Sequence, residues 1–63
     1  SPLLFHKKYD DAIHILDSTY QSYTPYSRNA GIIAYSLASA YQGKNDHENT
    51  IKYFAISAIS DIL

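Results

Sequence analysis

The fold is decided by residues 33–54, IAYSLASAYQGKNDHENTIKYF. Apolar residues recur at spacings of three and four through both ends of this stretch, which is the period of a helix that buries one face. The two patterns are separated by Gly43–Asp46, a cluster of residues that tolerate left-handed or capping conformations. The stretch therefore predicts two helices joined by a short loop and packed antiparallel.

The helical pattern continues on both sides of this stretch. We predict helices near residues 8–23, 26–42 and 46–62, with a second break at Ser22–Pro25, where proline disfavours a helical residue before it. The apolar stripes comprise Tyr9, Ala12, Ile13, Leu16, Tyr20 and Tyr23 in the first helix, Ala30, Ile33, Ala34, Leu37, Ala38 and Tyr41 in the second, and Ile51, Phe54, Ala55, Ala58, Ile59 and Ile62 in the third.

These stripes are expected to face one another and form the core. We predict that Phe54 is the central core residue, and that it meets Leu37, Tyr41 and Ile51 between the last two helices.

The helix starts carry capping residues. Asp46 suits the N-cap of the third helix, because a carboxylate there accepts hydrogen bonds from free backbone N–H groups. The second helix has two candidate starts: Thr24 as cap with Pro25 as first helical residue, or Ser27 as cap one turn later.

Composition limits what the chain can be. Its 63 residues carry five basic and six acidic side chains, a net charge of −1, and no cysteine. Disulfides and thiolate metal sites are therefore ruled out, and there is no basic stripe of the kind that nucleic-acid binders use. No apolar run approaches the roughly 20 residues of a membrane span. Because the chain begins with Ser1-Pro2, we expect it to be a piece of a longer protein.

Two segments of the chain resemble each other in sequence, which indicates an internal repeat. Residues 9–16, YDDAIHIL, align with residues 47–54, HENTIKYF, at an offset of 38, with acid matching acid and apolar matching apolar residues. Self-similarity at such a period is typical of stacked helical repeats.

On these residues the chain resembles the tetratricopeptide repeat (TPR) family. Leu37, Ala38 and Tyr41 match the first helix of a repeat, with Ala34 where a bulky residue is usual, and Asn45-Asp46 stands at the turn. Thr50, Phe54 and Ser57 match the second helix, although Thr50 and Ser57 are small polar residues where alanine is usual. Residues 8–13, KYDDAI, look like the second helix of the preceding repeat. The offset of 38 exceeds the usual 34, and the extra residues are expected to lengthen the loop around residues 24–27. The resemblance implies an all-α fold: three antiparallel helices of a right-handed superhelix, as one domain over residues 1–63.

A closer resemblance is to the TPR segment of a group of Bacteroidetes membrane-anchored transcriptional regulators. It rests on residues 33–38, IAYSLA, and residues 53–62, YFAISAISDI. The resemblance implies that the segment is a sensory or assembly part of a regulator. The regulator resemblance also implies that the segment lies on the periplasmic side of the membrane. If the chain is not part of such a regulator, a cytoplasmic location is expected.

Catalytic and metal sites have little support in the sequence. Asp10, His14 and Asp17 share one helix face, where two carboxylates around an imidazole are able to hold a metal. A solvated helix face is the favoured interpretation, because no second cluster supplies further ligands. Gly31 and Gly43 are isolated, so there is no phosphate-binding glycine loop. We predict no enzymatic activity and no cofactor.

The seven tyrosines favour contact with other proteins. Tyr9, Tyr20 and Tyr41 are assigned mainly to packing, whereas Tyr35, with Tyr26 or Tyr53, is assigned to contact. In the TPR family, ligands lie along the groove formed by the first helices of the repeats. The positions here that match this groove are Ile32, Tyr35, Ser36, Ser39 and Gln42.

The expected partner is a protein or peptide, and no nucleic acid or membrane is expected to bind this segment. None of the five groove residues is basic, which disfavours a clamp for a terminal carboxylate. The alternative function is a small three-helix DNA-binding module, but Lys52 is the only basic residue of the third helix. We also expect self-association through the open outer face of the first or third helix.

Overall fold

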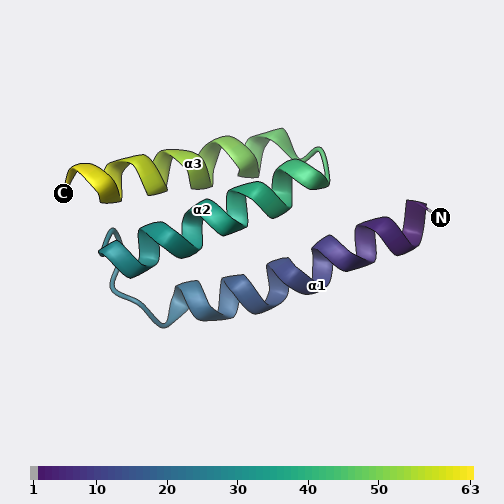
Figure 1. Cartoon of the computed structure of the whole chain (residues 1–63), viewed down its shortest axis with the longest axis horizontal. Coiled ribbons are helices and arrows are strands. Elements are labelled where there is room, and N and C mark those ends of the chain that lie inside the picture. The colour runs from purple at the N-terminus through teal and green to yellow at the C-terminus, as the bar shows by residue number, and fades with distance from the viewer. Residues whose placement is uncertain (1) are drawn as a thin grey trace.

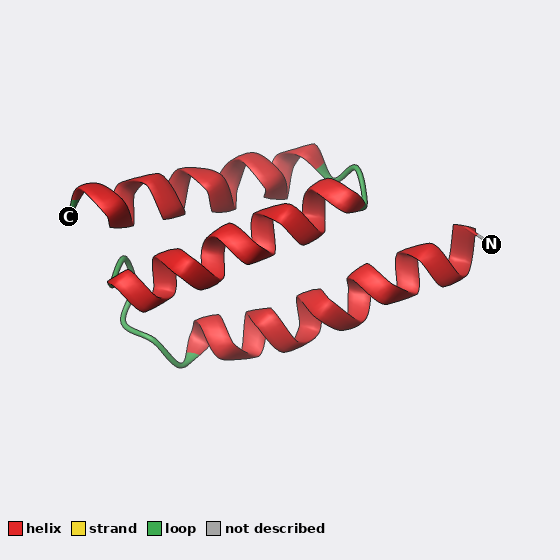
Figure 2. Cartoon of the chain, in the orientation of Figure 1, coloured by secondary structure: helices red, strands yellow, loops and turns green. Residues whose placement is uncertain are grey.

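The computed structural model describes the backbone of residues 2–63 and the side chains of residues 6–63. Within that range the chain forms three α-helices and no strand. They are α1 (Pro2–Gln21), α2 (Arg28–Gly43) and α3 (His47–Ile62), separated by two short loops (Figures 1 and 2). The fold is thus all-α, as predicted. Helix α1 begins at Pro2 rather than near Lys8, and proline suits the first helical position because its missing N–H would have no partner there.

Each helix runs antiparallel to the next one in the chain, and α2 lies between α1 and α3 (Figure 1). Helix α2 packs against both α1 and α3, and the two chain ends lie at opposite ends of the long axis (Figure 1). This order makes α2 the element around which the core is built.

The core consists mainly of small residues of α2 and a cluster of tyrosines. Leu37 is the one large side chain of the described residues that is fully buried, and Ala34 and Ala38 beside it are equally inaccessible. The Tyr53 ring stacks on the Tyr41 ring, with centroids 5.6 Å apart and planes 2° apart. Burial raises the pKa of both phenols above their ordinary value.

Two close approaches bring the helices together. A Cβ atom added at Gly31 would stand 2.5 Å from Cβ of Ser60, so the missing side chain lets α2 and α3 touch at that point. A Cβ added at Gly43 would stand 2.3 Å from the Tyr9 ring, so α1 packs against the end of α2 for the same reason. Lys44 secures that end, because its ammonium group donates a hydrogen bond to the carboxylate of Asp10.

The structure decides between the two candidate starts of α2. Ser27 is the N-cap, and its hydroxyl oxygen accepts a hydrogen bond from the backbone N–H of Ala30 at 3.2 Å. Asp46 caps α3 as predicted. Between α2 and α3, Asn45 has a φ of 62°, the left-handed conformation in which asparagine is the best substitute for glycine.

The Asp46 cap gives a prediction about acid stability. Hydrogen bonds from the Asn49 side chain, at 2.9 Å, and from its backbone N–H, at 3.2 Å, hold the pKa of Asp46 below its ordinary value of 3.8. A lowered pKa stabilises the fold above that ordinary value, and the contribution is lost as the pH falls through the pKa of the folded state. Asparagine caps equally well but does not titrate. Asp46→Asn is therefore expected to flatten the fall in thermal unfolding temperature between about pH 5 and pH 2.

The control for this prediction is Asp61→Asn, because Asp61 forms no hydrogen bond or ion pair with the described residues. Melting curves followed by circular dichroism at several pH values make the measurement. Equal acid sensitivity of Asp46→Asn and the unchanged chain would show that the cap contributes nothing to the titration.

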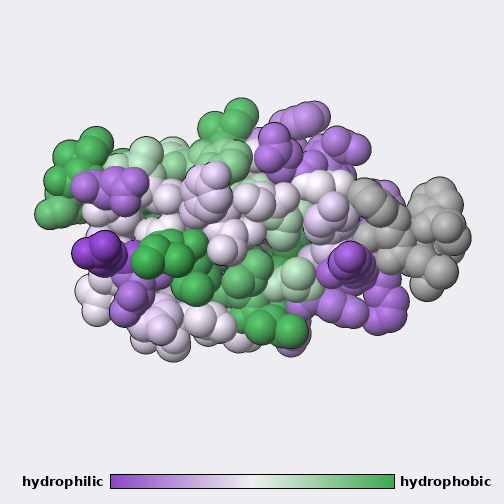
Figure 3. Space-filling view, in the orientation of Figure 1, coloured by the Kyte–Doolittle hydropathy of each residue, from purple (hydrophilic) through white to green (hydrophobic). Residues whose placement is uncertain are grey.

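The apolar stripe of α3 points away from the core, contrary to the prediction. Ile51, expected between α2 and α3, is 70% exposed, and Ile62 is 82% exposed. The face that contacts α2 instead includes Thr50 and Ser60, both buried. Figure 3 shows apolar side chains gathered along the outer edge of α3 and at its C-terminal end. The helix was predicted correctly, but the direction of its apolar face was wrong.

The aromatic centre of the core also differs from the prediction. Phe54, predicted as the central residue, is only partly buried, whereas Tyr53, assigned to partner contact, is 8% exposed. Tyr53 is enclosed because the Tyr20 ring of α1 meets it edge-on, with centroids 5.8 Å apart, while Tyr41 covers its face. The core therefore draws side chains from all three helices.

Candidate partner-binding groove

The solvent face of α2 carries the five residues predicted for the groove. Ala34, Leu37 and Ala38 turn inward, so residues about half a turn away must turn outward. Tyr35 is 58% exposed, and Ser36 is half-buried. The other three members of the predicted set, Ile32, Ser39 and Gln42, are exposed.

Tyr35 is exposed but held in place. Its ring meets the Phe54 ring of α3 with centroids 5.4 Å apart and an angle of 65° between the planes. Edge-on aromatic contacts of this kind are favourable and directional. A large aromatic surface is thus presented to solvent by two helices in an orientation that is already fixed, which lowers the entropy lost on binding.

A hollow lies beside this ring, between α2 and α3. It encloses about 280 Å³ and is lined by Gly31, Ile32, Tyr35, Ser36, Ser57 and Asp61. The close approach at Gly31 brings α3 alongside α2 at this point. The structure thus brings together three of the five predicted residues, Ile32, Tyr35 and Ser36, whereas Ser39 and Gln42 follow further along α2 and do not line the hollow.

The lining of this hollow includes two serines, Ser36 and Ser57, and carries a charged side chain at one position only. The Ser39 hydroxyl, further along α2, donates to the Tyr35 carbonyl oxygen at 3.2 Å, so its oxygen is left to accept a hydrogen bond from a ligand. Asp61 supplies the one carboxylate of the lining. Sequence reasoning missed both Ser57 and Asp61, although their spacing of three and seven residues from Phe54 places all three on one side of a helix.

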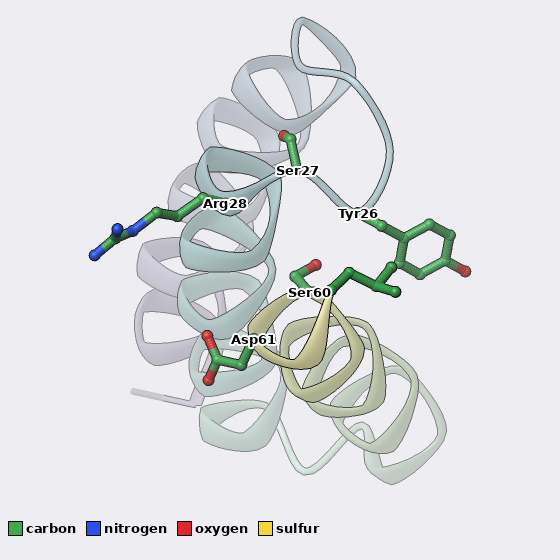
Figure 4. A pocket seen from close by; sticks show the side chains of 6 residues that line it. Tyr26, Ser27, Arg28, Ser60 and Asp61 are labelled. Carbon is green, nitrogen blue, oxygen red and sulfur yellow. The ribbon is translucent and has the colours of Figure 1, made fainter.

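A second, larger hollow lies where α2 begins and α3 ends. It encloses about 580 Å³, shares Asp61 with the first hollow, and is otherwise lined by Tyr26, Ser27, Arg28, Ser60 and Leu63. Tyr26 has a φ of 62°, and Figure 4 shows its ring and the Arg28 side chain extending to opposite sides of the helix start. Arg28 makes no ion pair with the described side chains. The two hollows adjoin at Asp61 and are treated together as one groove.

The acidic face of α1 does not gather into a site. Asp10 is bound to Lys44, while the neighbouring Asp11 pairs with Lys7 at 3.2 Å. Among the described residues no group of three histidine, aspartate or glutamate side chains is arranged to hold a metal ion. Between Pro2 and Leu63 no helix is long and apolar enough to cross a membrane.

Fold and groove together define the class of protein. A helix pair joined by the Gly43–Asp46 turn, with a preceding helix packed on its first member, is the TPR arrangement of helical repeats. The family model of the SusR N-terminal TPR domain matches residues 2–63. The chain therefore belongs to this family, the N-terminal domain of a Bacteroidetes regulator, as its sequence indicated. No curated protein and no solved structure was matched. TPR domains mediate protein–protein interactions and are generally non-catalytic scaffolds.

Proposed function

We propose that this chain is a non-enzymatic interaction module of a larger sensory or transcriptional regulator, and that it binds a peptide or partner helix in the groove of α2. Residues 1–63 act in this proposal as one unit, made of a helix pair and the second helix of the preceding repeat. The proposal requires no cofactor, no nucleic acid and no insertion into a membrane.

The observation that carries the proposal is the exposed Tyr35 ring fixed against Phe54 beside an apolar hollow. A side chain 58% exposed yet packed edge-on at 5.4 Å combines contact area with little freedom to lose. Tyrosine in such a setting dominates many interfaces. Ser39 and Gln42 extend the same face with groups able to hydrogen-bond a partner backbone, and neither is used by the core.

The DNA-binding alternative has less support. A recognition helix presents basic or amide side chains to the major groove. The solvent face of α3 is apolar, and its one basic side chain, Lys52, lies over the Tyr53 ring at 5.1 Å from the centroid. We therefore propose proteins, rather than nucleic acid, as the ligands.

The first test is photo-crosslinking within the intact regulator. p-Benzoylphenylalanine placed at position 35 is expected to give protein adducts, which mass spectrometry identifies. The same residue placed at position 23 serves as control, because Tyr23 is also exposed but lies past the end of α1, outside both hollows. Equal adduct patterns from the two positions would contradict the groove.

Substitutions then measure the strength of the contact. The double substitution Tyr35→Ala and Gln42→Ala is expected to weaken binding of the crosslinked partner by at least about 10-fold, the usual effect of losing a tyrosine hot spot. Tyr23→Ala with Gln21→Ala is the matched control. Both residues are exposed and lie at the end of α1 or just after it, and neither lines a hollow. Unchanged affinity of the first variant, with helix content intact, would leave the domain as a spacer.

A further inference from the structure

The outer face of α3 carries exposed apolar side chains that the proposed α2 groove does not use. Ile51, Ala55, Ala58, Ile59 and Ile62, hereafter the α3 stripe, are all exposed and recur at helical spacing. No charged residue interrupts the stripe; Lys52 and Asp61 border it on opposite sides. Contiguous exposed apolar patches of this extent often have a function in binding.

We infer that the α3 stripe binds the α3 stripe of a second copy of this chain, in an antiparallel pair. The inference is independent of the α2 groove. Four of the five stripe residues are placed symmetrically along the helix: bulky Ile51 and Ile62 stand at the two ends, and small Ala55 and Ala58 lie between them. The fifth, Ile59, lies at the side of this line, toward Lys52. A two-fold axis through the middle of α3 therefore sets Ile51 level with Ile62 of the second copy. It likewise sets Ala55 level with Ala58.

This register suits the shape and charge of the helix. Alanine at the centre lets two backbones approach closely, while the isoleucines close the ends of the contact. Lys52 would lie beside the last turn of the α3 of the second copy, where free carbonyl oxygens carry partial negative charge. An isologous contact of this kind also closes on itself, so it produces a dimer and not a fibre.

The available area fits a weak dimer. The exposed fractions of Ile51, Ile59, Ile62 and Leu63 correspond to about 500 Å² per copy, so two facing α3 helices bury about 1,000 Å² in total, the size at which specific interfaces begin. Interfaces at this low end of the size range are weak, so we expect dimers at concentrations on the order of 0.1 mM.

The outer face of α1 is a poorer partner for the stripe. It does present an isoleucine, Ile15, which is 65% exposed, but the Lys7–Asp11 ion pair and His14 lie around it. Covering charged groups with an apolar surface is costly, because they lose their hydration. A head-to-tail contact between α3 and α1 is thus disfavoured relative to two α3 stripes.

Sedimentation equilibrium of the 63-residue chain, from about 10 µM to 1 mM, tests the pairing. The unchanged chain is expected to dimerise, and Ile51→Glu or Ile62→Lys is expected to raise the dissociation constant at least about 10-fold. Glutamate and lysine are both good helix formers, and lysine at position 62 also suits the C-terminal end of the helix dipole, so α3 itself should remain helical by circular dichroism. Ile15→Glu and Ile32→Glu, at exposed isoleucines of α1 and α2, are the matched controls and should change the constant less than about twofold.

The combined variant Ile51→Glu with Ile62→Lys tests the register. In the antiparallel pair the introduced acid faces the introduced base of the second copy, so dimerisation should return to within about threefold of the unchanged chain. Within one chain the two positions are about 16 Å apart along the helix, too far to pair. A parallel pair would instead set like charges together. Failure of the combined variant to recover would overturn the antiparallel register.

Two further outcomes would overturn the inference altogether. A monomer at all concentrations would mean that something other than a second copy covers the stripe. Dissociation by Ile15→Glu as strong as that by Ile51→Glu would assign the contact to α1.

Discussion

Replacement of Tyr53 by alanine is expected to lower the free energy of unfolding by about 3–5 kcal/mol, the range found for buried aromatic residues. The Tyr53 ring is covered by Tyr41 on one face and met by Tyr20 at its edge, so its loss removes contacts with both other helices. A chain of 63 residues has few kcal/mol of stability in total. We therefore expect the variant to be largely unfolded at room temperature.

The control for Tyr53→Ala is Phe54→Ala, its neighbour on α3. Phe54 is only partly buried: it packs against the edge of the buried cluster and also contacts the exposed Tyr35 ring. Its loss is expected to cost about 1–2 kcal/mol, less than a fully buried side chain. Urea titrations followed by circular dichroism measure both values. A larger loss for Phe54→Ala than for Tyr53→Ala would restore Phe54 as the centre of the core.

Leu37→Ala is expected to cost about 2–5 kcal/mol, because Leu37 is fully buried at the centre of α2 and the substitution leaves a cavity. Its buried neighbours Ala34 and Ala38 are small, and the larger side chains packed around this cluster are expected to close the cavity only in part.

The contrasting variant is Ile51→Ala, an isoleucine that the apolar pattern ranks with Leu37. Because Ile51 is 70% exposed, this change is expected to alter stability by no more than about 0.5 kcal/mol. The comparison should be made at about 10 µM, below the concentrations at which α3 stripes are expected to pair. A cost for Ile51→Ala that matches Leu37→Ala would mean that α3 is rotated toward the core.

The two solvent faces of the helix pair differ in character. The α2 groove combines one fixed aromatic ring with polar groups, which suits recognition of a separate partner. The α3 stripe is apolar throughout and offers area without hydrogen-bonding groups. Such a surface is better suited to a symmetric contact between copies. If both proposals hold, a dimer would present two α2 grooves.

The local features of the fold were predictable from sequence alone. The break at Gly43–Asp46, the left-handed Asn45 and the Asp46 cap depend on residues adjacent in the chain, whose conformational preferences act over one or two turns. It was also predictable that the five residues proposed for the groove lie away from the buried side of α2, because Ala34, Leu37 and Ala38 fix which side of that helix is buried.

Only the tertiary structure decided which face of α3 is buried. A helical period reveals that an apolar stripe exists, but not which neighbour covers it. Besides the Tyr41–Tyr53 stack, the buried face of α3 includes two small polar residues, Thr50 and Ser60. Their hydroxyls donate to the carbonyl oxygens of Asp46 and Ile56 within the same helix, at 2.7 Å and 2.9 Å, so neither hydroxyl is left without a partner. Close approach at Gly31 requires a small partner such as Ser60, and Ile51, Ile59 and Ile62 lie on the exposed side of α3. The same antiparallel packing brings Ser57 and Asp61 beside Tyr35, a proximity between distant parts of the chain that no local pattern encodes.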